Sequence, residues 1–81
     1  MKVTLKLNRV GMTMEEATLV RWCVQPGERF EKGDVLYEIE TEKVTEEVTA
    51  SESGTLLEAL AAEDDIVAVN DGICIIETDN D

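Results

Sequence analysis

Few side chains in this sequence have the types and spacing of a catalytic site. The chain contains no histidine, which removes the commonest general base and metal ligand. Cys23 and Cys74 are far apart, whereas a redox pair normally has the C-x-x-C spacing. Each cysteine lies in an apolar run, so we expect both to be small buried side chains. With no glycine-rich phosphate-binding motif either, the sequence disfavours an enzyme with a reaction centre of its own.

Lys43 has the most distinctive position among the lysines, which are Lys2, Lys6, Lys32 and Lys43. Residues 35–41 and 44–50 have the pattern of strands, and only Glu42 and Lys43 stand between them. A two-residue connection is typical of a β-hairpin, although Glu-Lys is poor chemistry for a primed turn. The amine of Lys43 is therefore expected at an exposed tip. The simplest interpretation is a solvated lysine that also protects a strand edge.

The composition describes one small acidic domain, and we expect residues 1–81 to form a single folded unit. The 43% of hydrophobic residues suffices for a thin core. The 19 acidic residues against 7 basic ones give a net charge of −12, which disfavours binding to nucleic acid or to an anionic membrane surface. The N-terminal segment alternates and carries charge, unlike a signal peptide, and no apolar run approaches the roughly 20 residues of a bilayer span. A bacterial cytoplasm, or else the mitochondrial matrix, is the expected location.

Short alternating runs separated by turn residues predict an all-β chain. The expected strands are residues 3–7, 18–24, 35–41, 44–50, 55–60 and 72–78. Between the second and third runs, Pro26 and Gly27 occupy the central positions of a predicted type II turn. Residues 56–63 are rich in Leu, Ala and Glu and form the one segment with a helical alternative. Trp22 is expected to be a packing residue.

The sequence contains an internal repeat. A shift of 37 positions aligns residues 17–41 with residues 54–78 without a gap. Gly33 then falls on Asn70, and both residue types tolerate a positive φ. Residues 39–41 fall on 76–78 with the same three residue types. We interpret the repeat as two similar half-barrels that face each other across a shared core.

The repeat makes the Lys43 hairpin and the chain ends equivalent places. In the first half, the strand that ends at Thr41 continues through Glu42 and Lys43 into its partner strand. In the second half, the strand that ends at Thr78 meets the end of the chain, and residues 2–7 supply its partner. The two places are expected at opposite poles. A group on Lys43 would therefore project away from a tether at the termini.

Nearly the whole chain resembles one family. The matching stretches are GMTMEEATLVRW at residues 11–22, PGE at 26–28, GDVLYEIETEKV at 33–44, EVTA at 47–50 and GTL at 54–56. They resemble the lipoyl domains of the dihydrolipoyl acyltransferases in 2-oxo acid dehydrogenase complexes. The resemblance implies a flattened barrel or sandwich of two antiparallel four-stranded sheets with pseudo-two-fold symmetry. It also implies that lipoic acid is attached covalently to Lys43 at the tip of a hairpin.

The resemblance implies roles for further residues. The attachment enzyme would recognise five positions, namely Gly27, Glu40, Glu42, Val44 and Gly54. Partner proteins would contact Met12, Met14 and Glu46, although partial core packing is the simpler interpretation for the two methionines. Three residues depart from the family pattern, since Glu42 replaces the usual Asp, Glu46 an apolar residue and Ser51 a proline.

The implied function is that of a carrier with no catalysis of its own. The lipoyl group on Lys43 would be reductively acylated and would carry acyl groups and electrons between active sites of a 2-oxo acid or acetoin dehydrogenase complex. The implied partners are a lipoate ligase or lipoyl transferase, a thiamine-diphosphate-dependent dehydrogenase component, an acyltransferase catalytic domain and dihydrolipoamide dehydrogenase. The isolated domain is expected to be a monomer, with neither nucleic acid nor membrane as partner. Acidic residues near the tip would steer basic partner surfaces, or serve solubility alone.

Three other classes of protein share some of these features. A biotinyl carrier domain has the fold and the hairpin lysine, but that family flanks its lysine with methionines, where this chain has Glu42 and Val44. A glycine-cleavage carrier protein is longer and has additional helical segments. An acidic protein that mimics nucleic acid would account for the charge of −12, but it does not account for a lysine in a symmetric hairpin.

Overall fold

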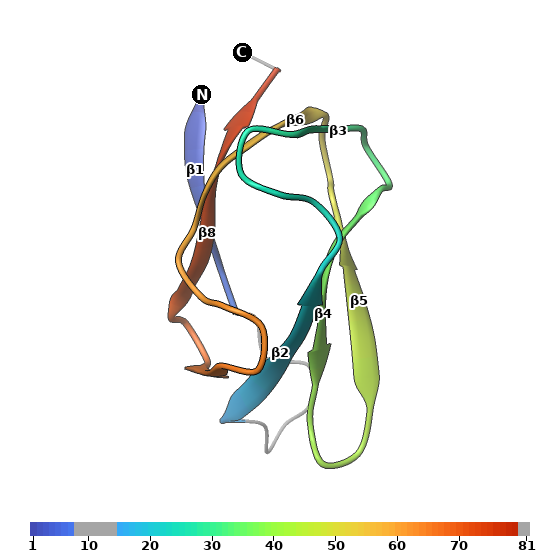
Figure 1. Ribbon diagram of the computed structural model, residues 1–81, viewed down its shortest axis with the longest axis vertical. Helices are drawn as coiled ribbons and strands as arrows, with labels where there is room; N and C mark the ends of the chain where they lie inside the picture. Colours follow the sequence, from blue (N-terminus) through green and yellow to red (C-terminus); the bar gives the residue numbers. More distant parts are fainter. Residues whose placement is uncertain (8–14, 80–81) are drawn as a thin grey trace.

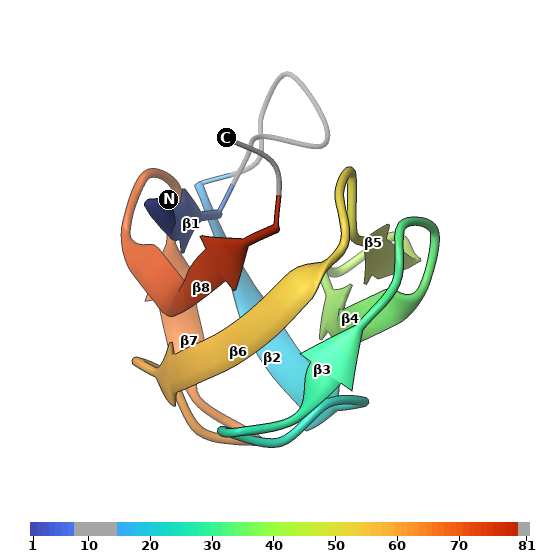
Figure 2. The same ribbon diagram turned by 90° about the horizontal axis from the view of Figure 1, so that it is seen from above.

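The alternating runs form eight strands in two antiparallel sheets (Figures 1 and 2). The computed structural model describes residues 1–7 and 15–79. One sheet has the order β1 (Lys2–Lys6), β8 (Gly72–Thr78), β6 (Gly54–Ala59) and β3 (Arg29–Phe30). The other has the order β5 (Thr45–Thr49), β4 (Val35–Glu40), β2 (Glu16–Trp22) and β7 (Ile66–Ala68). The predicted fold is confirmed as an open sandwich of two four-stranded sheets, not a closed barrel.

The predicted strands are confirmed with small shifts at their ends, but the helical alternative for residues 56–63 is wrong. The structure has β6 there, and the described residues contain no helix, hence none long and apolar enough to cross a membrane. Pairing of β6 with both β8 and β3 outweighs the helical propensity of its Leu and Ala residues. The sequence pattern predicts neither β3 nor β7, which have only 2 and 3 residues.

The internal repeat is confirmed in detail. The shift of 37 positions places β2 on β6, β3 on β7 and β4 on β8, at matching places in the two sheets. Bulges recur as well, because the register shifts between Leu19 and Arg21 in β2 and between the equivalent Leu56 and Glu58 in β6. Positive φ angles among the described residues form two equivalent pairs: Gly27 (91°) with Asp64 (74°), and Gly33 (92°) with Asn70 (77°). One supersecondary unit is thus used twice.

The hairpin and the chain ends lie at opposite poles, as predicted (Figure 1). At the end of β4, the Thr41 N–H donates to the Val44 carbonyl at 2.8 Å. At the end of β8, the Thr78 N–H donates to the Met1 carbonyl at 2.9 Å. β5 is therefore matched by β1 in the other sheet. Figure 1 shows Met1 and the end of β8 at the top and the β4–β5 hairpin at the bottom, and we call these the terminal pole and the hairpin pole.

The core lies between the two sheets and draws on both halves of the chain. Its most completely buried side chains are Phe30, Leu7, Leu19, Leu56, Ile73 and Cys74. Burial of Phe30 explains why the short strand β3 holds its place. Trp22 packs edge-on against Tyr37, with ring centroids 5.2 Å apart, which confirms its role in packing.

The two cysteines differ in burial, and the expectation that both are buried is wrong for Cys23. Cys74 is 0% exposed within β8. Cys23 is exposed and directly follows β2, and beyond the bulge in that strand Val24 takes the inward position. Leu60, which is equivalent to Cys23 in the repeat, is exposed as well. Exposure therefore belongs to this position of the repeated unit and not to the residue type.

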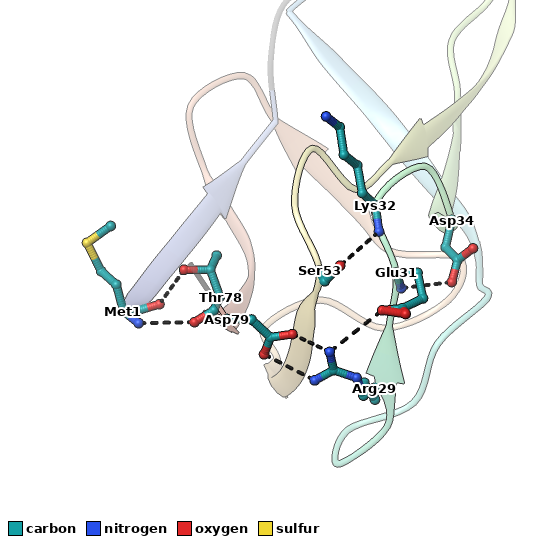
Figure 3. Close-up of polar contacts among 8 residues, drawn as sticks. All are labelled: Met1, Arg29, Glu31, Lys32, Asp34, Ser53, Thr78 and Asp79. Carbon is teal, nitrogen blue, oxygen red and sulfur yellow. Dashed lines mark hydrogen bonds and ion pairs between the residues drawn. The ribbon is translucent and has the colours of Figure 1, made fainter. Parts of the chain in front are cut away.

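Polar contacts fasten the terminal pole (Figure 3). Arg29 of β3 forms a bidentate ion pair with Asp79, with Nη1 and Oδ1 at 3.1 Å. The Asp79 N–H donates to the Ser53 carbonyl at 3.0 Å. The hydrogen bond from Arg29 holds the pKa of the Asp79 carboxyl below its ordinary value. These contacts tie the residue after β8 to the edge strand β3 and to the residue before β6, at a place where no turn joins them.

Candidate functional site

Lys43 lies at the tip of the β4–β5 hairpin, where only Glu42 and Lys43 separate Thr41 from Val44. The Lys43 side chain is exposed. Within the described residues, its amine has no hydrogen bond and no ion pair. Figure 1 shows the tip at the far end of the sandwich from the terminal pole. An amine in this place is accessible to another protein and has no competing contact from the part of the chain that the structure describes.

The Thr41 side chain holds the turn. Glu42 and Lys43 both have negative φ, which excludes the primed turns of types I′ and II′. The Thr41 hydroxyl accepts the N–H groups of Lys43 at 3.3 Å and of Val44 at 3.2 Å. It also donates to the Val44 carbonyl at 3.3 Å. Because a hydroxyl has one donor and two acceptor positions, this one is fully used.

An acidic surface surrounds the tip and consists of the exposed side chains of Glu40, Glu42, Glu46 and Glu47. Pairing of β4 with β5 places Glu47 opposite Glu38, so two negative charges meet across the strands. Arg21 offsets this repulsion, because its Nε and Nη2 lie 2.9 and 2.7 Å from Glu38 Oε2. The hydrogen bond to Glu38 also raises the pKa of Arg21. None of the four acidic side chains forms an ion pair with a basic residue in the described part of the chain.

Three of the five positions predicted for the attachment enzyme lie beside Lys43. They are Glu40, Glu42 and Val44, and all three are exposed. Val44 presents an apolar side chain that is 46% exposed next to the lysine. Gly27 and Gly54 are not brought together with Lys43, because Gly54 pairs with Thr78 at the terminal pole and Gly27 lies in the turn before β3.

Backbone constraints account for glycine at both distant positions. Gly27 has a φ of 91° in a turn closed by the Glu28 N–H and the Gln25 carbonyl at 2.9 Å, as predicted for type II. A Cβ atom at Gly54 would overlap the backbone oxygen of Glu77 in β8. The packing of β6 against β8 thus requires glycine at position 54, whatever an attachment enzyme contacts. At position 27 the positive φ favours glycine, although Asp64 adopts a similar conformation at the equivalent place of the other half.

Of the residues predicted to contact partners, the structure describes Glu46, whereas Met12 and Met14 lie outside the described residues. Glu46 is exposed on the edge strand β5, directly opposite Ile39, whose side chain points into the core. The equivalent residue of β1 is Val3, which packs against the core. A charge on the inner side of an edge strand opposes pairing with a strand from another molecule.

Thr41 is the residue of this site that the sequence motifs did not single out. Threonine beside a turn is a known signal, because its hydroxyl can bond to the backbone of the turn. The repeat also aligns Thr41 with Thr78, one of its few identical pairs.

A family model described as Biotin-requiring enzyme, with the name Biotin_lipoyl, matches residues 3–76. The chain belongs to this family. Within the family it is a lipoyl domain, a carrier domain without catalysis of its own, as its curated relatives and a solved structure show.

Two relatives and one structure illustrate the similarity. The chain is 40% identical over 67 residues to the dihydrolipoyllysine-residue succinyltransferase component of the 2-oxoglutarate dehydrogenase complex of Bacillus subtilis, which covers 83% of this chain and 16% of that protein. It is 39% identical over 82 residues to pyruvate dehydrogenase E1 component subunit beta of Rhizobium meliloti, covering 100% of this chain and 18% of that protein. The lipoyl domain of the 2-oxoglutarate dehydrogenase complex from Azotobacter vinelandii matches with a TM-score of 0.80 at 25% identity, over 93% of this chain and 95% of that one. The chain therefore spans less than a fifth of the length of these curated relatives.

Proposed function

We propose that this domain carries lipoic acid in amide linkage to Lys43 and serves a 2-oxo acid dehydrogenase complex. The observation that carries the proposal is the exposed amine of Lys43, which has no partner among the described residues and stands at the tip of a hairpin. The relatives support this kind of complex, since they include components of 2-oxoglutarate, branched-chain and pyruvate dehydrogenases.

The residues at the tip fit a covalently attached group. When bound, lipoic acid supplies a disulfide that takes up an acyl group with two electrons and releases them at other active sites. The protein presents the point of attachment, because β4 and β5 fix the tip and the Thr41 hydroxyl bonds to its backbone. The terminal pole lies at the other end of the sandwich, so a tether there would leave the tip free to enter partner active sites (Figure 1). Tethering would keep the effective concentration of such a group high, of the order of mM for short linkers.

The acidic surface supports partners with basic docking sites. Glu40, Glu42, Glu46 and Glu47 would attract such sites and would set the ionic-strength dependence of the encounter. The partners we propose are a lipoate ligase or lipoyl transferase for attachment, and the dehydrogenase, acyltransferase and dihydrolipoamide dehydrogenase components for turnover. Glu42 and Val44 beside the lysine, in place of methionines, favour lipoate over biotin.

The test is attachment itself. The domain is incubated with lipoate, ATP and a lipoate ligase, and the intact mass and the peptide map are recorded. We expect one lipoyl group, on Lys43, and none on the Lys43→Arg variant, whose stability should change by less than about 0.5 kcal/mol because the site is exposed. Lys32→Arg is the matched control, since Lys32 also lies in an exposed turn but at the terminal pole (Figure 3). Attachment to any other lysine, or to the folded Lys43→Arg variant, would contradict the proposal.

A further inference from the structure

We infer that Thr41 is a positioning residue for the modification of Lys43, because its hydroxyl holds the backbone of the turn in one conformation and so sets the direction in which the lysine is presented. The inference rests on the proposed function, since it concerns the same lysine. It assigns the task of positioning to a neutral side chain outside the tip, where the flanking residues Glu42 and Val44 were the expected determinants.

The hairpin turn lacks one of the usual backbone hydrogen bonds. In a two-residue hairpin, the residues on either side of the turn normally exchange two backbone hydrogen bonds. Here the Thr41 N–H donates to the Val44 carbonyl at 2.8 Å, but the Val44 N–H donates to the Thr41 hydroxyl at 3.2 Å. Because the φ angles at the tip are negative, the turn does not follow the twist of its strands. The hydroxyl thus supplies the acceptor for the second bond.

The backbone of Lys43 is bound to the same hydroxyl. Its own N–H also donates to the Thr41 hydroxyl, at 3.3 Å, and this is the hydrogen bond of Lys43 that the structure shows. Without that hydroxyl, two N–H groups at an exposed tip would turn to water and the turn would sample several conformations. The direction of a side chain follows its backbone. An attachment enzyme that must bring the amine to an activated carbonyl loses rate when the approach is misaligned by about an ångström.

The terminal pole provides an equivalent threonine for comparison. Thr78 occupies the equivalent place at the terminal pole, and its N–H and hydroxyl both donate to the Met1 carbonyl, at 2.9 and 3.3 Å. Thr41 makes the same pair of bonds to the Val44 carbonyl. Donation to that carbonyl is therefore a property of the fold at both poles. At the hairpin pole the Thr41 hydroxyl also accepts two N–H groups of the turn, and one of them belongs to the residue that would be modified.

The experiment compares three variants of the whole domain with the parent: Thr41→Val, Thr41→Ser and Thr45→Val. Valine keeps the shape but removes the hydroxyl, whereas serine restores it. Thr45 is the matched control, because its hydroxyl lies in the same hairpin but reaches Glu40 Oε2 at 3.5 Å and not the turn. The kcat and KM of lipoate attachment are measured by intact mass, and amide hydrogen exchange of Lys43 and Val44 is measured by NMR without any ligase.

For Thr41→Val we expect kcat to fall about tenfold with KM within about twofold of the parent, because docking is intact and alignment is lost. Exchange at Lys43 and Val44 should be faster in the same variant. Thr41→Ser should restore both, and Thr45→Val should change neither. If Thr41→Val does not fold, Thr41→Ala takes its place with the same expectation.

Other outcomes separate this inference from the proposed function. A parent domain that is not modified on Lys43 contradicts the proposed function, while the exchange data still test the turn. Parent-like kcat and exchange in Thr41→Val overturn the inference and leave the function standing. The inference also fails if Thr41→Ser is as slow as Thr41→Val, or if the loss appears in KM alone.

Discussion

The hairpin pole and the terminal pole share a backbone pattern and differ in what closes them. At each pole, one threonine donates its N–H and its hydroxyl to a single carbonyl on the neighbouring strand. At the hairpin pole, Glu42 and Lys43 join the two strands covalently. At the terminal pole, the strands come from opposite ends of the chain and an ion pair from β3 fastens one of them. The repeated unit thus produces two equivalent poles. Only the hairpin pole is closed by a covalent turn, and this turn fixes the backbone position of Lys43.

The two matched edge strands also carry opposite charges. β1 presents Lys2 and Lys6, whereas β5 presents Glu46 and Glu47 at an edge of the other sheet. The backbone repeat is therefore kept although the charged side chains on the two edge strands differ in sign. The acidic strand β5 directly follows the turn that contains Lys43. A partner with a basic surface would therefore be attracted to the hairpin pole and not to β1.

The largest effect is expected from moving the amine within the closed turn. Exchanging Glu42 and Lys43 keeps the composition and the net charge. It shifts the amine to the neighbouring position, whose side chain points in another direction. We expect a folded domain that keeps its unmodified mass under conditions that fully lipoylate the parent. Modification at the parent's rate would mean that the local acidic sequence, and not the geometry of the pole, is recognised.

The next largest effect is a loss of stability on substitution of Gly54. This glycine is required for strand packing, and it is also a predicted contact of the attachment enzyme. Gly54→Ala should cost about 3 kcal/mol, because the new methyl group meets backbone and not a flexible side chain. Its equivalent in the repeat is the buried Ala17, and Ala17→Gly should cost only about 1 kcal/mol. Urea unfolding followed by Trp22 fluorescence measures both.

Attachment of lipoate to the Gly54→Ala variant tells the two roles apart. Folded molecules of this variant should be modified at the parent's rate, since Gly54 lies at the pole opposite Lys43. A fully folded variant with slow attachment would instead support the predicted contact between this glycine and the enzyme.

Alternation and repeat spacing predict most of this fold, because they record which side chains face the core. Residues 72–78 are confirmed as a strand without any shift, and the equivalence of Gly33 with Asn70 is confirmed by their positive φ angles. Strands β3 and β7 are too short to show a period. The repeat nevertheless aligns Phe30 with the buried Val67, so comparing the halves would have revealed both strands together.

The site is less predictable, because spacing indicates the hairpin but not its turn type. The residue types Glu42 and Lys43 argue against a primed turn, yet they do not show what replaces it. The Thr41 hydroxyl takes the place of the usual backbone acceptor. This contact depends on the rotamer of the Thr41 side chain, which a sequence pattern does not indicate. The exposure of Cys23 is unpredictable for a similar reason, since a bulge in β2 changes the alternation just before this residue, whereas the expected burial of Cys74 is confirmed.

A smaller loss of stability is expected at high pH from two buried residues, Tyr37 and Cys74, which occupy equivalent positions in the two halves. Tyr37 and Cys74 coincide under the repeat, and burial raises the pKa of both, that of Cys74 to about 11. Because the folded-state pKa of Cys74 is the higher one, the stability that its neutral thiol contributes is complete below about pH 9 and is lost as pH rises toward 11. Cys74 alone should account for roughly 2 kcal/mol of lost stability over this range. The loss at Tyr37 begins about one pH unit higher, at the ordinary pKa of tyrosine.

Urea unfolding at a series of pH values tests this loss. Cys74→Val should weaken the dependence on pH, whereas Cys23→Ser should leave it unchanged because Cys23 is exposed. A thiol reagent should likewise label one cysteine in the native domain and both after unfolding. Two labelled thiols in the native domain would contradict the burial of Cys74.

The smallest effect is expected where the terminal pole is held by an ion pair. Arg29 holds the pKa of Asp79 below its ordinary value, so the pair contributes stability above the unfolded-state pKa and loses it as pH falls. Both side chains are exposed, so Arg29→Gln should barely change the urea midpoint, and salt should remove the difference. An NMR titration should show the Asp79 pKa returning to its ordinary value, and the Asp79 amide, which donates to Ser53, should exchange faster. The Val44 amide at the hairpin pole should not respond, because covalent closure and Thr41 hold it independently of the ion pair. If exchange became faster at both amides, loss of the ion pair would also affect the hairpin pole. The conformation of the hairpin turn would then depend on the terminal pole and not on its local contacts alone.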